Sequence, residues 1–81
     1  MQVEDITVEN NNVQITGVLR NAQPKYLTTG GYVVGNIYGD VRGRFPDGSL
    51  IHTSFVVRQE GDLIFTLNSV YRVESWDIQF F

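Results

Sequence analysis

Apolar residues in this chain of 81 residues recur at every second position, and no stretch carries the stripe of an amphipathic helix. Val13, Ile15 and Leu19 share one face of a segment, and Trp76, Ile78 and Phe80 alternate near the C-terminus in the same way. Successive side chains of a strand point to opposite faces, so a period of two is typical of half-buried β-strands. The pattern therefore predicts a protein built from strands.

Turn-forming residues punctuate the alternation. Pro46-Asp47-Gly48 is the strongest hairpin signal, because proline presets one turn residue and glycine tolerates the positive φ of the next. Pro24 and Gly30-Gly31 predict that residues 20–31 form a long loop rather than a central strand, and they leave open whether that loop is ordered. The strands are then expected at residues 3–8, 13–19, 32–38, 41–45, 49–58, 63–67, 70–74 and 76–80.

Six to eight short strands in so small a chain predict an all-β fold, either a small barrel or a bent antiparallel sheet of SH3-like or related type. Residues 1–81 are expected to form a single β domain. A chain of this length buries roughly 60–65% of its unfolded surface, so its core is thin. It has no cysteine, which excludes disulfides and leaves oligomerisation as the means of added stability.

Charge and targeting signals narrow the function classes. Six basic residues against nine acidic ones give a formal charge of −3, which argues against a dedicated nucleic-acid binder. The N-terminus lacks the basic and apolar regions of a signal peptide, and no apolar run is long enough to span a membrane. We therefore expect a cytoplasmic protein that acts away from membranes.

Arginine is concentrated in the second half of the chain. Arg42 and Arg44 are two residues apart and would project from one face of a strand, with Gly43 leaving the opposite face open. Guanidinium groups suit bidentate recognition of phosphate or carboxylate, so these residues predict a site for an anion or an acidic partner. The alternative is a solvated face of ion pairs. Further residues assigned to the ligand or partner site are Asp47, Arg58 and Arg72.

A second polar group follows in the segment Ile51-His52-Thr53-Ser54. His52 and Ser54 would share a strand face, but nothing near them supplies the sharp turn or the oriented carboxylate of nucleophilic catalysis. We therefore expect no catalytic residues and no enzyme activity. A single histidine and scattered aspartates predict no metal site and no cofactor. In a pocket, His52, Thr53, Ser54, Asn68 and Ser69 would be the natural hydrogen-bonding set.

The C-terminal residues Trp76, Ile78, Phe80 and Phe81 are unusually apolar for a terminus. Two phenylalanines left in water would make an adhesive patch. The last strand is therefore expected either to dock into its own sheet or to pair with another chain. A homodimer built through these four residues is the oligomer interface that the sequence predicts.

The segment from Gly35 to Val73 carries a rhythm of short motifs: Gly39-Asp40, Gly43-Arg44-Phe45, Asp47-Gly48, Ile51-His52-Thr53-Ser54, Asn68-Ser69, Val70-Tyr71 and Val73. In these residues the chain resembles a family of small β proteins of phages, prophages and mobile elements that has no settled biochemical activity. The resemblance implies a setting in which small proteins act by binding, for example by inhibiting a host enzyme, blocking a defence complex or sequestering a signalling nucleotide.

These features predict a non-enzymatic binding protein that inhibits or modulates a host protein or defence complex. A second hypothesis is a protein that binds or sequesters a small molecule or nucleotide, with an anionic ligand held by Arg42, Arg44, His52, Thr53, Ser54 and Asn68 in a pocket between protomers. A third is a small β-barrel that binds nucleic acid, which the acidic charge disfavours.

Overall fold

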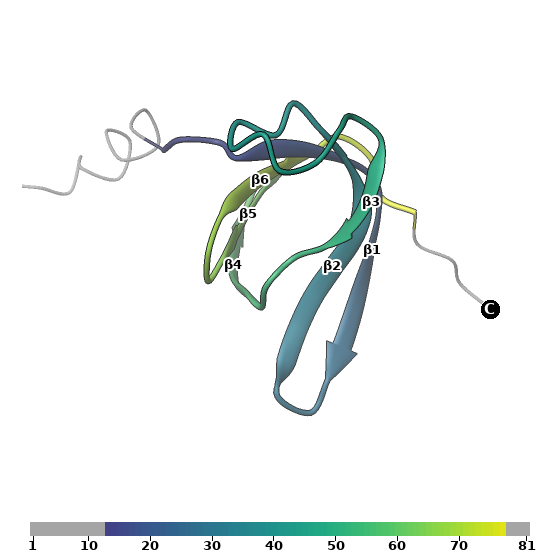
Figure 1. Cartoon of the computed structure of the whole chain (residues 1–81). Coiled ribbons are helices and arrows are strands. Elements are labelled where there is room, and N and C mark those ends of the chain that lie inside the picture. The colour runs from purple at the N-terminus through teal and green to yellow at the C-terminus, as the bar shows by residue number, and fades with distance from the viewer. Residues whose placement is uncertain (1–12, 78–81) are drawn as a thin grey trace, which may run out of the picture.

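The computed structural model describes residues 13–77, which form a single β-sheet (Figure 1). No helix occurs in this part of the chain. The strand predicted at residues 3–8 and most of that predicted at 76–80 lie outside the described residues. The strands are β1 (Gly17–Leu27), β2 (Gly30–Tyr38), β3 (Ser49–His52), β4 (Val56–Glu60), β5 (Leu63–Thr66) and β6 (Val70–Val73).

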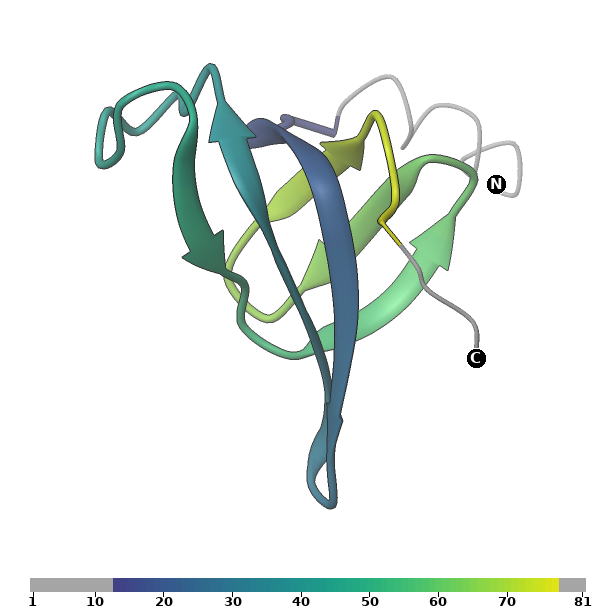
Figure 2. The same ribbon diagram turned by 90° about the vertical axis from the view of Figure 1, so that its right-hand side faces the viewer.

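The strands follow the order β3-β2-β1-β6-β5-β4, so β3 and β4 are the two edges of the sheet. The sheet is strongly bent but is not closed into a barrel (Figures 1 and 2). The prediction of an all-β bent sheet is confirmed, and β2, β5 and β6 match their predicted strands within two residues at each end. One pair departs from the antiparallel expectation, because β1 and β6 run parallel.

The prediction of a long loop at residues 20–31 is wrong, because β1 and β2 continue through it as a hairpin that projects beyond the rest of the sheet (Figure 2). Pro24 lies inside β1, opposite Val33. Strand β6 pairs with β1 only at residues 17–19, so β1 has a single full-length partner where the proline occurs. A proline is tolerated there for the same reason that it is tolerated on an edge strand.

A β-bulge marks the point where β1 leaves the body of the sheet. The register shifts between Arg20 and Gln23, and Asn21 takes a φ of 57°. Asparagine is one of the few non-glycine residues that adopt this left-handed conformation readily. The inserted residue bends β1 and lets Ala22 point into the core, where its side chain is completely buried.

The core lies on one face of the bent sheet. Leu19, Ile37 and Ile64 are the largest fully buried side chains, and they come from β1, β2 and β5. Burying one such side chain contributes about 1.5–3 kcal/mol. The same cluster contains Ala22, Val33, Ile51, Tyr71 and Val73.

Residues 39–48 connect β2 to β3 as a loop, and the strand predicted at 41–45 is therefore wrong. The buried carboxylate of Asp40 organises this loop by accepting hydrogen bonds from the backbone N–H groups of Arg42, Arg44 and Phe45, at 3.1, 2.8 and 3.1 Å. Burial alone would raise the pKa of Asp40, but these bonds and the nearby Arg44 guanidinium hold the pKa below its usual value. Because these hydrogen bonds close the loop on itself, residues 41–45 do not pair with a strand.

The single strand predicted at residues 49–58 is also wrong, since the chain leaves the sheet between β3 and β4. The Thr53 amide still donates to the Val33 carbonyl of β2, at 2.8 Å, but the chain then turns away to start β4. Pro46-Asp47-Gly48 is a turn, as expected, with the Ser49 amide donating to the Pro46 carbonyl at 3.1 Å. It closes the loop that precedes β3 rather than joining two strands.

Candidate functional site

The arginine side chains do not gather into one face. Arg44 lies in the 39–48 loop, Arg58 on the edge strand β4 and Arg72 on β6. Each is paired with an acidic side chain, and apart from the buried Asp40 carboxylate the paired groups are exposed, which matches the alternative of a solvated ionic face. The nitrogen–oxygen distances are 3.6 Å for Arg44–Asp40, 3.0 Å for Arg58–Glu60, 3.5 Å for Arg72–Asp62 and 2.7 Å for Arg20–Glu74.

Arg42 differs from the other arginines. Its guanidinium donates to the Ser69 hydroxyl at 3.1 Å and to the Asn68 carbonyl at 2.9 Å, both neutral acceptors. Among residues 13–77 it is the one arginine without a carboxylate partner. It lines a depression of about 510 Å³ together with Gln14, Thr16, Val41, Thr66, Leu67, Asn68, Ser69 and Val70.

Asp47 has a local structural role. Its carboxylate accepts a hydrogen bond from the Gly39 amide at 2.8 Å and so ties together the two ends of the 39–48 loop. The loop is closed further by the Gly48 amide, which donates to the Ile37 carbonyl at 2.6 Å. These contacts shape the loop.

His52 and its neighbours lie on or beside the edge strand β3. The His52 ring is exposed and meets the Tyr32 ring edge-on, with centroids 6.1 Å apart. The buried hydroxyl of Thr53 accepts from the Val33 amide at 3.0 Å and donates to the Ser54 carbonyl at 2.7 Å. The Ser54 hydroxyl accepts from the Asn68 amide at 3.2 Å. The hydroxyl groups of Thr53 and Ser54 are therefore both hydrogen-bonded to backbone groups.

The structure places these three residues in the wall of an apolar groove, which we name the β3 groove. Its volume is about 650 Å³, within the usual range of ligand pockets. Leu27 and Tyr32 of the projecting hairpin line it together with Leu50 of β3. The lining is Leu27, Tyr32, Val34, Leu50, Ile51, His52, Thr53, Ser54, Phe55 and Leu67.

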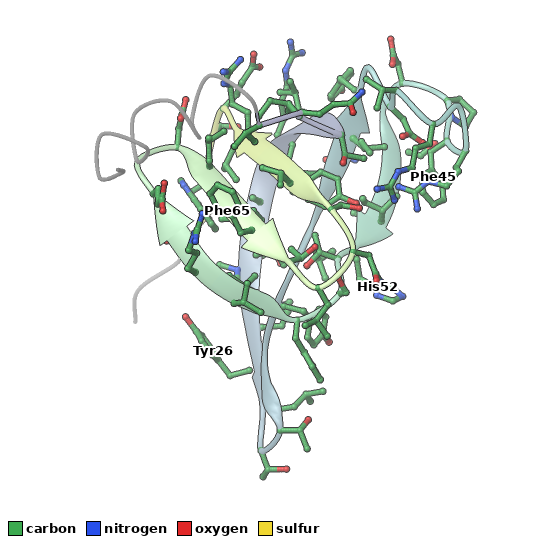
Figure 3. The ribbon with its side chains drawn as sticks, turned by 90° about the vertical axis from the view of Figure 1, so that its left-hand side faces the viewer. Tyr26, Phe45, His52 and Phe65 are labelled. Atoms are coloured by element: carbon green, nitrogen blue, oxygen red, sulfur yellow. The ribbon has the colours of Figure 1, made fainter. Side chains whose placement is uncertain are left out.

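The segment that joins β3 to β4 also lines the β3 groove, through Thr53, Ser54 and Phe55. The Leu67 amide donates to the Phe55 carbonyl at 3.0 Å, which holds Leu67 beside this segment. The Phe55 ring packs toward Gly30 at the tip of the hairpin, where a Cβ atom would lie 3.5 Å from the ring. Figure 3 shows that His52 and Tyr26 lie on opposite sides of this hairpin.

Sequence reasoning found the polar members of the groove and missed its apolar ones. Leu27 falls in the predicted loop at residues 20–31, Leu50 and Phe55 in the strand predicted at 49–58, and Leu67 in the strand predicted at 63–67. Leu50 and Leu67 are 70% and 65% exposed, and neither the alternation of the sequence nor residue type distinguishes an exposed leucine from a buried one. The predicted pocket of six polar residues does not form: His52, Thr53 and Ser54 line the β3 groove, Arg42 and Asn68 line the separate depression, and Arg44 lines neither.

The predicted oligomer interface is described only at its first residue. Trp76 is partly exposed and forms a single parallel bridge with Ala22. Ile78, Phe80 and Phe81 lie outside the described residues, so the homodimer stays a prediction. The structure therefore fixes where the C-terminal segment starts, on the side of β1 that faces away from β2.

Within residues 13–77, no three of the His, Asp and Glu side chains gather as metal ligands would. The same part of the chain contains no helix long and apolar enough to cross a membrane. Comparison of the chain with protein-family models, curated proteins and solved structures found no match.

Proposed function

We propose that the chain is a non-enzymatic binding protein that holds an extended, apolar segment of a partner protein in the β3 groove. The observation that carries this proposal is the exposure of three leucines around one groove: Leu50 at 70%, Leu67 at 65% and Leu27 at 56%. Apolar surface gathered in a concave site is characteristic of ligand and partner recognition, whereas single exposed leucines are ordinary.

The edge of β3 supports an extended occupant. The Thr53 amide bonds to Val33 of β2, and backbone groups in an antiparallel pair alternate between facing the partner and facing away. The N–H and C=O groups of Leu50 and His52 therefore face the open side of β3. A strand added there would pair with this backbone and place alternate side chains in the groove, as in β-augmentation.

The setting of the proposal comes from the family resemblance. Small proteins of phages and mobile elements act on their hosts by binding, and an apolar groove beside a free strand edge suits a host protein that offers a flexible segment. The proposed action is inhibition or modulation of that host protein by occupying the segment. No covalent chemistry is required of the site, and both hydroxyls in its wall already hold backbone.

The test is selection of binding peptides from a random nine-residue display library against the purified full chain, followed by titration of a selected synthetic peptide. We expect peptides with alternating apolar residues, and we expect Leu50→Asp to weaken binding at least tenfold. Val57 on β4 is 60% exposed and lies outside the groove, so Val57→Asp is the matched control and should bind normally. Equal binding to both variants would exclude the groove as the site.

The depression around Arg42 favours a second candidate function, binding of a small anionic ligand such as a phosphate compound. The guanidinium of Arg42 uses two donors on neutral oxygens and retains others, and the Gln14 and Asn68 side chains lie around the same depression. Titration with inorganic phosphate, followed by NMR, should move the Arg42 signals in the wild type and leave Arg42→Gln unaffected. Arg58→Gln is the control, because Arg58 already pairs with Glu60.

A further inference from the structure

The three strands around the β3 groove hold an unequal share of the charge of the chain. Strands β1, β2 and β3 contain two of the six basic residues, Arg20 and Lys25, and the single histidine, His52, but none of the nine aspartates and glutamates. The whole chain nevertheless has a formal charge of −3. These strands are therefore a positively charged part of an acidic protein.

The strand register places Lys25 and His52 on the face that lines the groove. Lys25 is opposite Tyr32 of β2, and His52 is opposite Val34. Directly paired residues of neighbouring strands share a face of the sheet, and Tyr32, Val34 and His52 all line the groove. Lys25 also comes two residues before Leu27, another lining residue, and so shares its strand face.

Arg20, the other basic residue of these strands, is paired on the opposite side of β1. Its guanidinium contacts the carboxylate of Glu74 at 2.7 Å, and Glu74 directly follows β6, the neighbour of β1 on that side. The side chains of this pair are about half exposed. Lys25 and His52 are thus the two basic groups that the register places beside the groove.

We propose that the partner segment in the β3 groove is acidic as well as apolar, with a carboxylate beside His52 and Lys25. The inference rests on the proposed function, because it concerns the same groove and the same extended segment. A strand added at β3 has one residue opposite His52 and, two positions away on the same face, another opposite Leu50. The first position suits a carboxylate, and the second suits an apolar side chain.

Lys25 acts on the part of the segment that extends past the end of β3. That strand ends at His52, and the hairpin continues beyond it with Tyr32 and its direct neighbour Lys25. An imidazole N–H and an ammonium group both donate hydrogen bonds to a carboxylate. Opposite charges on neighbouring strands are favourable, whereas like charges are unfavourable.

The basic groups give the groove a means of choosing between apolar segments. The exposed leucines contact any apolar side chain of suitable size, and so they contribute affinity more than selection. Complementary charge favours the right partner, and repulsion between like charges excludes wrong ones. The groove is therefore expected to accept an apolar segment that carries aspartate or glutamate and to reject one that carries lysine or arginine at the same place.

The random nine-residue display library that tests the proposed function also tests the charge of the segment. Selection against the full chain at low ionic strength, where exposed charges are least screened, should enrich aspartate and glutamate and deplete lysine and arginine relative to the unselected library. A synthetic copy of a selected acidic peptide should bind more weakly when its carboxylates are replaced by amides. Raising the salt concentration should reduce that difference.

Lys25→Glu locates the carboxylate. It should weaken binding of the acidic peptide by about fivefold, because like charges then lie on neighbouring strands, and it should bind the amide form of the peptide as the wild type does. Arg72→Glu makes the same change in net charge and is the matched control. Arg72 lies on β6 opposite Val18, near the start of β1, whereas Lys25 is near its end, so Arg72→Glu should bind both peptides normally.

The results that would overturn this inference also separate it from the proposed function. Apolar peptides selected without an excess of aspartate and glutamate would keep the groove as a peptide site and remove the acidic requirement. Equal binding of the acidic peptide to Lys25→Glu and the wild type would place its carboxylate away from the hairpin. Equal losses in Lys25→Glu and Arg72→Glu would reduce the effect to net charge. A selection that yields no binding peptide would exclude the groove itself, and the inference with it.

Discussion

Thr53 and Val33 hold each other through a reciprocal pair of hydrogen bonds. The Thr53 amide donates to the Val33 carbonyl at 2.8 Å, and the Val33 amide donates to the Thr53 hydroxyl at 3.0 Å. Thr53 is buried, and its hydroxyl replaces the backbone carbonyl that a longer β3 would have supplied. The pair fixes the end of β3 to β2 and so sets the wall of the β3 groove.

Thr53→Val should destabilise the protein by about 1–3 kcal/mol, because an isosteric side chain without a hydroxyl leaves the buried Val33 amide unsatisfied. Thr53→Ser keeps the hydroxyl and should lose less. Urea denaturation of the two variants and the wild type measures the difference. Equal stability of Thr53→Val and the wild type would mean that water replaces the hydroxyl.

Asp40 should make stability dependent on pH at the acidic end. Its pKa is lower in the folded protein than its ordinary value of 3.8, so the stabilisation is fully present above that value and is lost as the pH falls through the folded pKa. Asp40→Asn should be less stable at neutral pH, and the difference from the wild type should shrink below pH 3.8. Thermal unfolding of both proteins, measured from neutral pH to below pH 3.8, tests this prediction. A stability difference that does not change with pH would contradict the role given to the Asp40 carboxylate.

Gly35 is a glycine of β2 at which backbone atoms of β1 leave little room for an alanine side chain. A Cβ atom there would lie 3.2 Å from the Arg20 carbonyl oxygen and 3.3 Å from the Ala22 Cα, both backbone atoms that cannot rotate away. Gly35→Ala should therefore cost about 1–3 kcal/mol as an overpacked core position. Gly61 has a φ of 60° and open space around it, so Gly61→Asn is the control and should be tolerated. Chemical denaturation of Gly35→Ala, Gly61→Asn and the wild type measures their free energies of unfolding.

Asn21 should tolerate glycine and reject a β-branched residue. Its φ of 57° is easily adopted by glycine, whereas valine would be strained by about 1–2 kcal/mol. We expect Asn21→Gly to stay close to wild-type stability and Asn21→Val to unfold earlier in a thermal melt. Identical melting of the two variants would show that the bulge relaxes into a regular strand.

The sequence predicts the strand at residues 32–38 from a run that is apolar on both faces, whereas the structure buries only one face of β2: Val33 and Ile37 are buried and their neighbours are half-buried. It could not predict that residues 20–27 form a strand, because Pro24 is acceptable only once the partner on one side is missing, which is a property of the sheet. The strand predicted at residues 41–45 is wrong for a similar reason. The backbone N–H groups of Arg42 and Arg44 donate to the Asp40 carboxylate and so are not available to a neighbouring strand.

The candidate site was predictable in part. Thr53 and Ser54 do lie beside a groove, although their hydroxyls hold backbone rather than face a ligand. The exposure of Leu50 depends on β3 being an edge strand, and edge position follows from strand order rather than from local pattern. The separation of Arg42 from His52 likewise follows from the loop that carries the arginine.

The parallel pairing of β1 and β6 also has a consequence for the rate of folding. It joins residues 54 positions apart, as in the contact of Arg20 with Glu74, whereas the hairpins β1–β2 and β4–β5 close over short turns. Closing a long loop costs chain entropy before its contacts form, so the two halves of the sheet are expected to assemble first and to join last. The seam between β1 and β6 is thus the slow step, and its substitutions should alter the rate at which the chain folds.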